Sequence, residues 1–395
     1  MDFVNFGIKK NILIGITSSI AAYKIYELIR FFKKSGFEVK TILTPNAKNF
    51  VSPLVLETLT NSKVYFEQFS PREDVEHIEL AKWADVFLIA PISANTISKT
   101  ATGVADNLLT SIFCAYLGTK KPFVLAPAMN TNMWQNPFVK ENLSKLKKEG
   151  AIVVEPESGF LACGDNGIGK LADIENIFHY TLRSLFQKKE NNSKKMVVTY
   201  GGTKEKIDSV RCLTNSSSGK MGRALSLWGF YLGFEVASVS TFQDKLPFLN
   251  IVSNSALEML EALKNLEFDY LIMAAAVGDF RIKQENEFKI SKENVGEILN
   301  LEFIKNPDVV FEIAKNKKEN QKIVGFCLAD RDLIETAKKK LKNKNLDYIV
   351  ANDVKTALNT SENRVTIIEK SGKIKDIEQD KKEIIAKKIL EVVCD

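Results

Sequence analysis

Residues 187–195 read QKKENNSKK, a run without a single apolar side chain. Residues 11–19, far upstream, read NILIGITSS, and residues 196–203, directly downstream, read MVVTYGGT. Each of these two stretches is a short apolar strand that leads into a turn of small residues, as an α/β nucleotide-binding unit begins. Because this start occurs twice, on either side of a solvated segment, the sequence predicts two α/β domains in tandem.

The predicted boundaries are 1–188 for the first domain, 189–195 for the linker and 196–395 for the second domain. The chain of 395 residues is long enough for two domains that each bury a core of their own. The alternative is one large domain with a polar surface loop at 187–195.

The composition is that of a globular protein, with 45% hydrophobic and 26% charged residues. The five cysteines are odd in number and lack CxxC or metal-ligand spacing, which favours reduced thiols and a cytoplasmic location. We expect no signal peptide, no membrane span and no nucleic-acid partner. The net charge of +6 suits phosphate-bearing substrates, although solvated helix faces explain it equally well.

Every predicted strand of the first half ends in small polar residues, and the carboxyl ends of parallel strands are where ligands bind. The predicted strands are 12–16, 39–44, 84–90, 122–126 and 151–154, with a helix over 19–34 after the first of them. The turn at 15–19 has one glycine instead of the GxGxxG pattern, so a dinucleotide fingerprint is absent. Its hydroxyls and backbone N–H groups still suit a single phosphate.

Two further features of the first half can carry chemistry. His77, one of two histidines, precedes the third strand, and by itself it fits a structural role better than a catalytic one. Residues 155–170 read EPESGFLACGDNGIGK, where four glycines surround Cys163 outside any periodic pattern. A mobile loop that carries a thiol over a site is the functional interpretation, and a plain surface loop is the alternative.

Five motifs of the first half occur together in a specific order: SSIAAYK (18–24), PISANT (91–96), ADNLL (105–109), PAMNTNMW (127–134) and LACGDNGIGK (161–170). In this order and spacing, residues 10–180 resemble the flavin-dependent cysteine decarboxylases. Within these they resemble the phosphopantothenoylcysteine decarboxylase domains of bifunctional coenzyme A biosynthesis proteins. The resemblance implies a flavodoxin-like three-layer fold that binds FMN. Ile92 and Lys170 depart from the family pattern, and we expect neither to change the chemistry.

The resemblance also implies roles for individual residues. Catalytic roles fall on His77, Asn130 and Cys163, with Cys163 as the proton donor and Asn130 holding the departing carboxylate. Contacts to the decarboxylase substrate fall on Met133 and Ala162. FMN contacts fall on Ser18, Ser19, Ile20, Thr44, Ser93, Ala94, Asn95, Thr96 and Ala128. Loss of CO2 from an unactivated carbon needs an electron acceptor, which FMN supplies in a cycle that is redox-neutral overall.

The second half repeats the pattern of polar residues at strand ends. Its predicted strands are 197–200, 235–241, 270–276, 323–326 and 348–350, and its predicted helices are 223–232 and 337–344. Residues 216–219, followed by Lys220 and the first of these helices, are a candidate phosphate cradle without the spacing of a Walker A loop. Asn306-Pro307-Asp308 is an ordinary helix-start signal, and single lysines are usually solvated.

As a set, the motifs of residues 196 to about 370 resemble the phosphopantothenate–cysteine ligase domain, the usual partner of the decarboxylase, with a Rossmann-like fold. The motifs are GGTKEKIDSVRCLTNSSSGKMG (201–222), AAAVGDF (274–280), KISK (289–292), KNPDVV (305–310), VGF (324–326) and KNKNLD (342–347). The family activates the carboxylate of 4′-phosphopantothenate with CTP as an acyl-cytidylate, which the amine of cysteine then attacks.

This second resemblance assigns the acyl-cytidylate step to Asn215 and a catalytic charge to Lys289. CTP contacts fall on Ala274, Ala275, Asp279, Pro307, Asp308, Val309, Val310, Phe326, Lys340 and Lys344. Mg²⁺ is implied by the need to neutralise a triphosphate, with Asp279 as its protein contact. Ser291 stands where the family has a lysine, and Ala329 stands where it has a glutamate. We expect these departures to affect the detailed geometry of the nucleotide site and not the class of reaction.

Three other functions are weighed against this interpretation. A non-catalytic flavoprotein should lack His77 or Cys163, and both are present. An NAD-linked dehydrogenase should carry GxGxxG, and another flavin enzyme such as a prenyl transferase should lack the ligase half. The family forms its FMN site between protomers of a trimer and pairs its ligase domains, so the resemblance implies a homo-oligomer that acts on small molecules.

Overall fold

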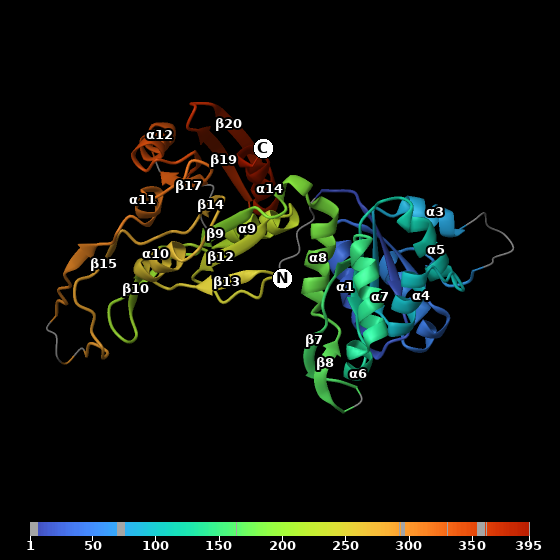
Figure 1. The fold of residues 1–395 in the computed structure, drawn as a ribbon. Coiled ribbons are helices and arrows are strands. Elements are labelled where there is room, and N and C mark those ends of the chain that lie inside the picture. The colour runs from blue at the N-terminus through green and yellow to red at the C-terminus, as the bar shows by residue number, and fades with distance from the viewer. Residues whose placement is uncertain are drawn as a thin grey trace. The chain divides into compact units, whose positions relative to one another are not determined.

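The computed structural model consists of two compact units, residues 1–187 and 188–395. It describes residues 7–68, 76–162, 164–291, 293, 297–329, 331–353, 360 and 362–394. Each unit has a mostly parallel sheet with helices on both faces, which confirms the predicted fold class of two α/β domains (Figure 1). Within the described residues, no helix combines the length and the apolar composition needed to cross a bilayer.

The first unit contains a six-stranded sheet in the order β3-β2-β1-β4-β5-β6, in which all neighbouring strands are parallel. From β1 the chain builds outward through β2 to β3, and then it returns to the other side of β1. This reversal opens a crevice at the carboxyl ends of β1 and β4, where ligands bind in such sheets. The strands are β1 (Asn11–Ile16), β2 (Glu38–Leu43), β3 (Val64–Tyr65), β4 (Val86–Ile92), β5 (Phe123–Pro127) and β6 (Ile152–Val153).

Helices cover both faces of this sheet because its strands are apolar on both sides. On one face α1 (Ile25–Lys34) packs against α8 (Ile174–Phe186). The other face is covered by α3 (Glu76–Trp83), α4 (Ala94–Thr102), α5 (Leu108–Leu117) and α7 (Pro137–Lys148), whose apolar side chains share one core with alternate residues of the strands. Further helices are η2 (Pro45–Asn49), α2 (Pro53–Thr60) and α6 (Thr131–Gln135).

Two predictions for the first unit need correction. The predicted helix over 19–34 begins as a 3₁₀ segment, η1 (Ile20–Lys24), because Ser19 caps it and Ala22 N–H bonds the Ser19 carbonyl three residues back. The predicted glycine-rich loop is an antiparallel hairpin of β7 (Glu157–Phe160) and β8 (Asn166–Lys170). It escaped detection because its strands lack apolar alternation. Cys163 lies outside the described residues.

The second unit contains an eight-stranded sheet in the order β13-β12-β9-β14-β17-β18-β19-β20. Its first six strands are parallel, and β19 and β20 extend the sheet as antiparallel strands. The chain again reverses direction beside its first strand, because β9 lies between β12 and β14. The strands are β9 (Lys195–Tyr200), β12 (Glu235–Ser240), β13 (Leu249–Val252), β14 (Tyr270–Met273), β17 (Lys322–Ala329), β18 (Tyr348–Asp353), β19 (Glu362–Glu369) and β20 (Ile374–Lys381).

Helices again lie on both faces of this sheet. On one face α9 (Lys220–Tyr231) packs against α14 (Lys382–Val393), and α10 (Ala256–Lys264), α11 (Val309–Ala314) and α12 (Leu333–Asn343) share a core on the other. Two small hairpins project beyond the carboxyl edge: β10 (Lys204–Lys206) with β11 (Cys212–Thr214), and β15 (Phe280–Ile282) with β16 (Phe303–Lys305) (Figure 1). α10, α14 and the β19–β20 hairpin were not predicted from the sequence.

The polar segment between the units is packed onto the second unit. Its residues 189–191 form a short 3₁₀ helix, η3 (Lys189–Asn191). The backbone N–H of Lys188 and the side-chain amide of Asn191 both donate to the carbonyl of Leu232, at 3.0 and 3.1 Å. Asn191 is only 3% exposed. Composition could not show this, because a polar residue has the same sequence signature whether water or a buried carbonyl satisfies it.

We therefore propose that residues 1–187 and 188–395 fold independently, and that residues 188–194 form a stabilising cap on the second unit. The fragment 188–395 should melt cooperatively and be more stable than 195–395 by about 1–2 kcal/mol, because the shorter fragment loses both hydrogen bonds to Leu232. Chemical denaturation of the two fragments, with 1–187 measured beside them, provides the test. Equal stabilities would contradict the cap, and loss of cooperative unfolding in 1–187 or 188–395 would contradict autonomous folding.

Candidate functional site

In the first unit, hydrogen bonds join four strand ends at the carboxyl edge. Thr17 Oγ1 donates to the Pro91 carbonyl at 2.8 Å and accepts the N–H of Ser93 at 2.9 Å, which ties the end of β1 to β4. The N–H of Thr44 donates to Ile16 O and that of Ala128 donates to Ile92 O. The predicted FMN segments therefore share one edge. Thr17 was not predicted as a site residue, although the sequence places its hydroxyl in the turn that follows the first apolar strand.

The hydroxyls at this edge fall into two classes. Ser19 Oγ accepts from Ala21 N–H and Ser93 Oγ accepts from Thr96 N–H, each at 3.4 Å, so both serines cap the start of a helix. Thr44 Oγ1 is buried and lacks a hydrogen-bond partner among the described residues. A buried hydroxyl left unpaired by the protein fits a polar group of a bound ligand.

A cavity of about 450 Å³ opens beside this edge. Five predicted residues line it: Ser19, Ile20, Ala128, Asn130 and Ala162. Residues that were not predicted also line it, among them Tyr23, Lys24, Met129, Phe160 and Leu161. Apolar walls with a few polar groups are typical of cofactor and small-molecule sites.

Other residues predicted for this site do not line the cavity within the described part of the unit. They are Ser18, Thr44, His77, Ser93, Ala94, Asn95, Thr96 and Met133. Ser93 and the residues after it begin α4 at the same edge, whereas His77 is half-buried in α3. The fold thus brings Ser19, Ala128 and Asn130 to one cavity, but not His77.

Close backbone contact holds the glycine-rich hairpin against the loop that carries Asn130. Asn130 caps α6, with its side-chain oxygen accepting from Asn132 N–H at 2.8 Å. The N–H of Met129 donates to Gly169 O at 3.0 Å. A β-carbon at Gly169 would clash with the Met129 carbonyl, and one at Gly167 would clash with Thr131 Oγ1. These two glycines permit the approach, which is why the hairpin borders the cavity.

In the second unit, a cavity of about 430 Å³ lies at the carboxyl ends of β14 and β17. All predicted CTP contacts except Ala274 line it: Ala275, Asp279, Pro307, Asp308, Val309, Val310, Phe326, Lys340 and Lys344. Ala274 does not line the cavity, and its side chain instead lies next to Gly222 of α9. Lys305 and Asn306 also line the cavity but were not predicted as contacts.

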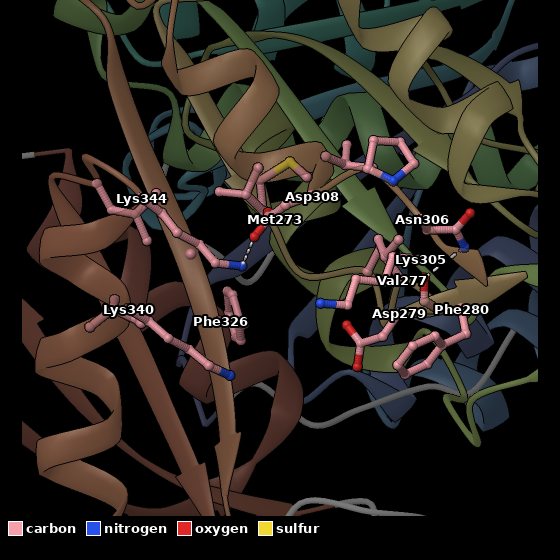
Figure 2. A pocket seen from close by; sticks show the side chains of 18 residues that line it. Met273, Val277, Asp279, Phe280, Lys305, Asn306, Asp308, Phe326, Lys340 and Lys344 are labelled. Atoms are coloured by element: carbon pink, nitrogen blue, oxygen red, sulfur yellow. Dashed lines mark hydrogen bonds and ion pairs between the residues drawn. The ribbon is translucent and has the colours of Figure 1, made fainter. Parts of the chain in front are cut away.

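The lining of this cavity is cationic and apolar. Lys340 of α12 and Lys344, directly after that helix, reach toward it, and Lys305 and Asp279 approach from the opposite side (Figure 2). Lys344 Nζ pairs with Asp308 Oδ2 at 2.8 Å, and the other oxygen of Asp308 caps α11 by accepting from Phe311 N–H. Three ammonium groups around one cavity favour a polyanion, and the exposed face of an aromatic ring such as Phe326 suits stacking.

Asn306 fixes the loop that carries Asp279. Its side-chain amide donates to Gly278 O at 2.8 Å, its side-chain oxygen accepts from Arg281 at 3.0 Å, and its backbone N–H donates to Asp279 O. The hydrogen bond to Gly278 is visible in Figure 2. In the described part of the chain, no three His, Cys, Asp or Glu side chains are grouped to hold a metal ion. Two carboxylates line the cavity, those of Asp279 and Asp308, and Asp308 is paired with Lys344.

The two predicted catalytic residues of the second unit, Asn215 and Lys289, do not line the cavity. Asn215 donates from its side chain to Val277 O at 3.2 Å, on the loop that forms the cavity wall. Lys289 is exposed in the segment between β15 and β16. The candidate phosphate cradle precedes α9, which starts at Lys220 after Gly219 adopts a φ of 68° and so begins three residues before the predicted helix.

Comparisons with known proteins cover nearly the whole chain. Residues 7–186 match the family model described as Flavoprotein, and residues 191–395 match that described as the DNA/pantothenate metabolism flavoprotein C-terminal domain. A coenzyme A biosynthesis bifunctional protein CoaBC from Borreliella burgdorferi is 40% identical over 97% of this chain and 99% of the relative. The protein of the same name from Bacillus subtilis is 38% identical over 92% and 91%.

Among solved structures, the C-terminal domain of a coenzyme A biosynthesis bifunctional protein CoaBC is 31% identical. It covers 52% of this chain and 96% of that domain, with a TM-score of 0.44.

The contact between Gly169 and Met129 yields a prediction about the hairpin. Gly169 has a φ of 143°, so Gly169→Ala should both strain the backbone and push the hairpin away from the Met129 carbonyl. Trypsin should then cleave at Lys170 about tenfold faster or more, because cleavage requires local opening. Gly118→Ala is the matched control, since its nearest neighbour would be 3.6 Å away. Equal cleavage rates in the two variants would show that the hairpin does not depend on this contact.

Proposed function

The chain belongs to the family of coenzyme A biosynthesis bifunctional proteins, and we propose that it catalyses both reactions of that family. The second unit joins 4′-phosphopantothenate to cysteine with CTP, through an acyl-cytidylate. The first unit decarboxylates the resulting 4′-phosphopantothenoylcysteine to 4′-phosphopantetheine. The observation that carries the proposal is the cationic cavity of the second unit, where residues from four separate sequence motifs meet.

In the ligase reaction we assign charge stabilisation to the cavity's lysines. Lys305, Lys340 and Lys344 would hold the nucleotide, with its cytosine near Phe326 and its phosphates toward the ammonium groups. Mg²⁺ commonly binds through one or two carboxylates together with substrate phosphates, so the single carboxylate of Asp279 fits such an ion. Asn215 and Lys289, from neighbouring segments, would act on the carboxylate being activated and on the departing pyrophosphate.

In the decarboxylase reaction we assign FMN to the carboxyl edge of the first sheet. The Thr44 hydroxyl, which has no partner among the described residues, the helix starts at Ser19 and Ser93, and the adjacent apolar cavity together fit a phosphate-bearing ring system. Bound FMN would supply the electron-accepting chemistry that loss of CO2 requires. Asn130 would hold the substrate carboxylate, Cys163 would deliver a proton, and Ala162 and Met133 would contact the substrate.

The position of His77 supports a shared site between protomers. Since His77 lies on α3 and does not line the cavity of its own unit, we propose that His77 of one copy completes the site of another. This assignment agrees with a homo-oligomer built from decarboxylase trimers and ligase dimers. We further propose that the protein acts in the cytoplasm on small molecules.

Replacement of Cys163 tests the proton donor. Because a serine hydroxyl is a far weaker acid than a thiol, Cys163→Ser should release CO2 from 4′-phosphopantothenoylcysteine in a single turnover but form little 4′-phosphopantetheine. Cys114→Ser, at an exposed position on α5, is the matched control and should retain both products. Measuring CO2 and 4′-phosphopantetheine in parallel decides the question. Product formation at the normal rate in Cys163→Ser would exclude Cys163 as the donor.

Replacement of Lys289 tests the ligase assignment. Lys289→Gln keeps hydrogen-bonding capacity but removes the charge, and it should slow pyrophosphate release from CTP with 4′-phosphopantothenate about a hundredfold. Decarboxylation by the first unit should not change. Lys283→Gln, in the same segment and in a surface ion pair with Glu302, should behave like the wild type. Unchanged pyrophosphate release in Lys289→Gln would reduce Lys289 to a solvated surface residue.

A further inference from the structure

We propose that Asp208 is a positioning residue for Lys289: together with Arg211, its carboxylate anchors the segment that carries Lys289 and connects it to the segment that carries Asn215. This inference rests on the proposed ligase function. It assigns a role to a residue that does not line the cavity and that would not itself contact the nucleotide.

The anchor consists of hydrogen bonds to the residue that directly follows Lys289. Ile290 N–H donates to Asp208 Oδ2 at 3.2 Å, and Arg211 Nη1 donates to Ile290 O, also at 3.2 Å. Both backbone polar groups of Ile290 are thus held by one acid–base pair. A second tie lies four residues earlier, where Asn286 N–H donates to Ile207 O at 3.1 Å. Lys289 itself is exposed, so the contacts described here fix its backbone and leave its ammonium group in solvent.

The Asp208 carboxylate can serve as an anchor because the protein surrounds it with donors. Oδ1 accepts from the N–H groups of Val210 and Arg211 at 2.8 and 2.7 Å, while Oδ2 also accepts from Arg211 Nη1 at 2.6 Å. The side chain of Asp208 is buried. Burial alone would raise its pKa, but the hydrogen bonds from Val210, Arg211 and Ile290 outweigh burial and lower the pKa to about 2. The carboxylate is therefore charged at any pH at which the enzyme works.

The same carboxylate also orders the approach to Asn215. Its Oδ1 closes the turn at 208–211, and β11 follows that turn directly and leads into Asn215. Asn215 in turn bonds the carbonyl of Val277 on the cavity wall. One buried charge thus holds two segments that are far apart in the sequence and that carry the two proposed catalytic groups. Fixed geometry of this kind contributes to rate, because the groups need not be ordered during the reaction.

The Asp208→Asn variant should remove the hydrogen bonds that anchor Ile290 and keep those that form the local turn. The asparagine oxygen can still accept from Val210 and Arg211 N–H, which preserves the turn. Its NH₂ group would replace Oδ2, where it would face the donors of Arg211 and Ile290 and could accept from neither. The substitution should therefore release Ile290 while leaving the 208–211 turn intact. Asp269→Asn is the matched control, since Asp269 accepts a backbone N–H from Lys195 at the start of β9, away from the carboxyl edge.

The decisive experiment is a double-mutant cycle in the full-length chain, measured as pyrophosphate release from CTP with 4′-phosphopantothenate. Asp208→Asn alone should lower kcat about tenfold or more, the size expected from losing hydrogen bonds to a charged group. In the Lys289→Gln background the same change should have little further effect, because a residue that acts through Lys289 has nothing left to position. Hydrogen exchange at the Ile290 amide should accelerate in Asp208→Asn and remain slow in Asp269→Asn.

Three outcomes would overturn the anchor while leaving the proposed ligase function intact: wild-type kcat in Asp208→Asn, a full additional loss in the double variant, or unchanged exchange at Ile290. If Asp208→Asn does not fold, Arg211→Met provides a second cycle, because it removes the side-chain donor to Ile290 O while the Arg211 backbone N–H still donates to Asp208 Oδ1. A wild-type chain that releases no pyrophosphate from CTP with 4′-phosphopantothenate would instead refute the ligase function itself.

Discussion

The reversal of strand order beside one central strand is the constraint on which both sites depend. In each unit the first strand pairs with neighbours on both sides, β1 with β2 and β4, and β9 with β12 and β14. The loops that leave neighbouring strand ends then diverge, and the edge between them cannot be closed by further pairing. Backbone and hydroxyl groups exposed at this edge must find partners, and a ligand can supply those that the protein does not.

The two units place different polar groups at this edge. In the first unit, most of these groups are hydroxyls. Thr17 bridges β1 and β4, Ser19 and Ser93 cap helix starts, and Thr44 is left without a partner among the described residues. In the second unit, charged and amide side chains on long loops surround the cavity, with Asn306 fixing the loop of Asp279 and Asp308 pairing with Lys344. The first arrangement suits a resident cofactor, whereas the second suits a polyanion that enters and leaves.

Glycines determine how closely each site can be covered. Gly167 and Gly169 allow the β7–β8 hairpin to approach the loop of Met129 and Asn130, where any side chain would collide with it. In the second unit, Gly202 faces the backbone of Asn215 in the same manner. The positions are therefore constrained by the approach of two backbones and not by chain flexibility.

The sequence by itself determined the two-domain α/β organisation and most of the parallel strands, because continuous apolar runs that end in small polar residues have few other structural solutions. The resemblance carried by its motifs also predicted nine of the eighteen residues that line the second cavity. Only the tertiary structure decided how the 188–194 segment packs, that the glycine-rich stretch forms a hairpin, and that Asp208 holds Ile290. Each of these depends on hydrogen bonds or backbone contacts between distant residues, and such contacts leave no periodic signal in the chain.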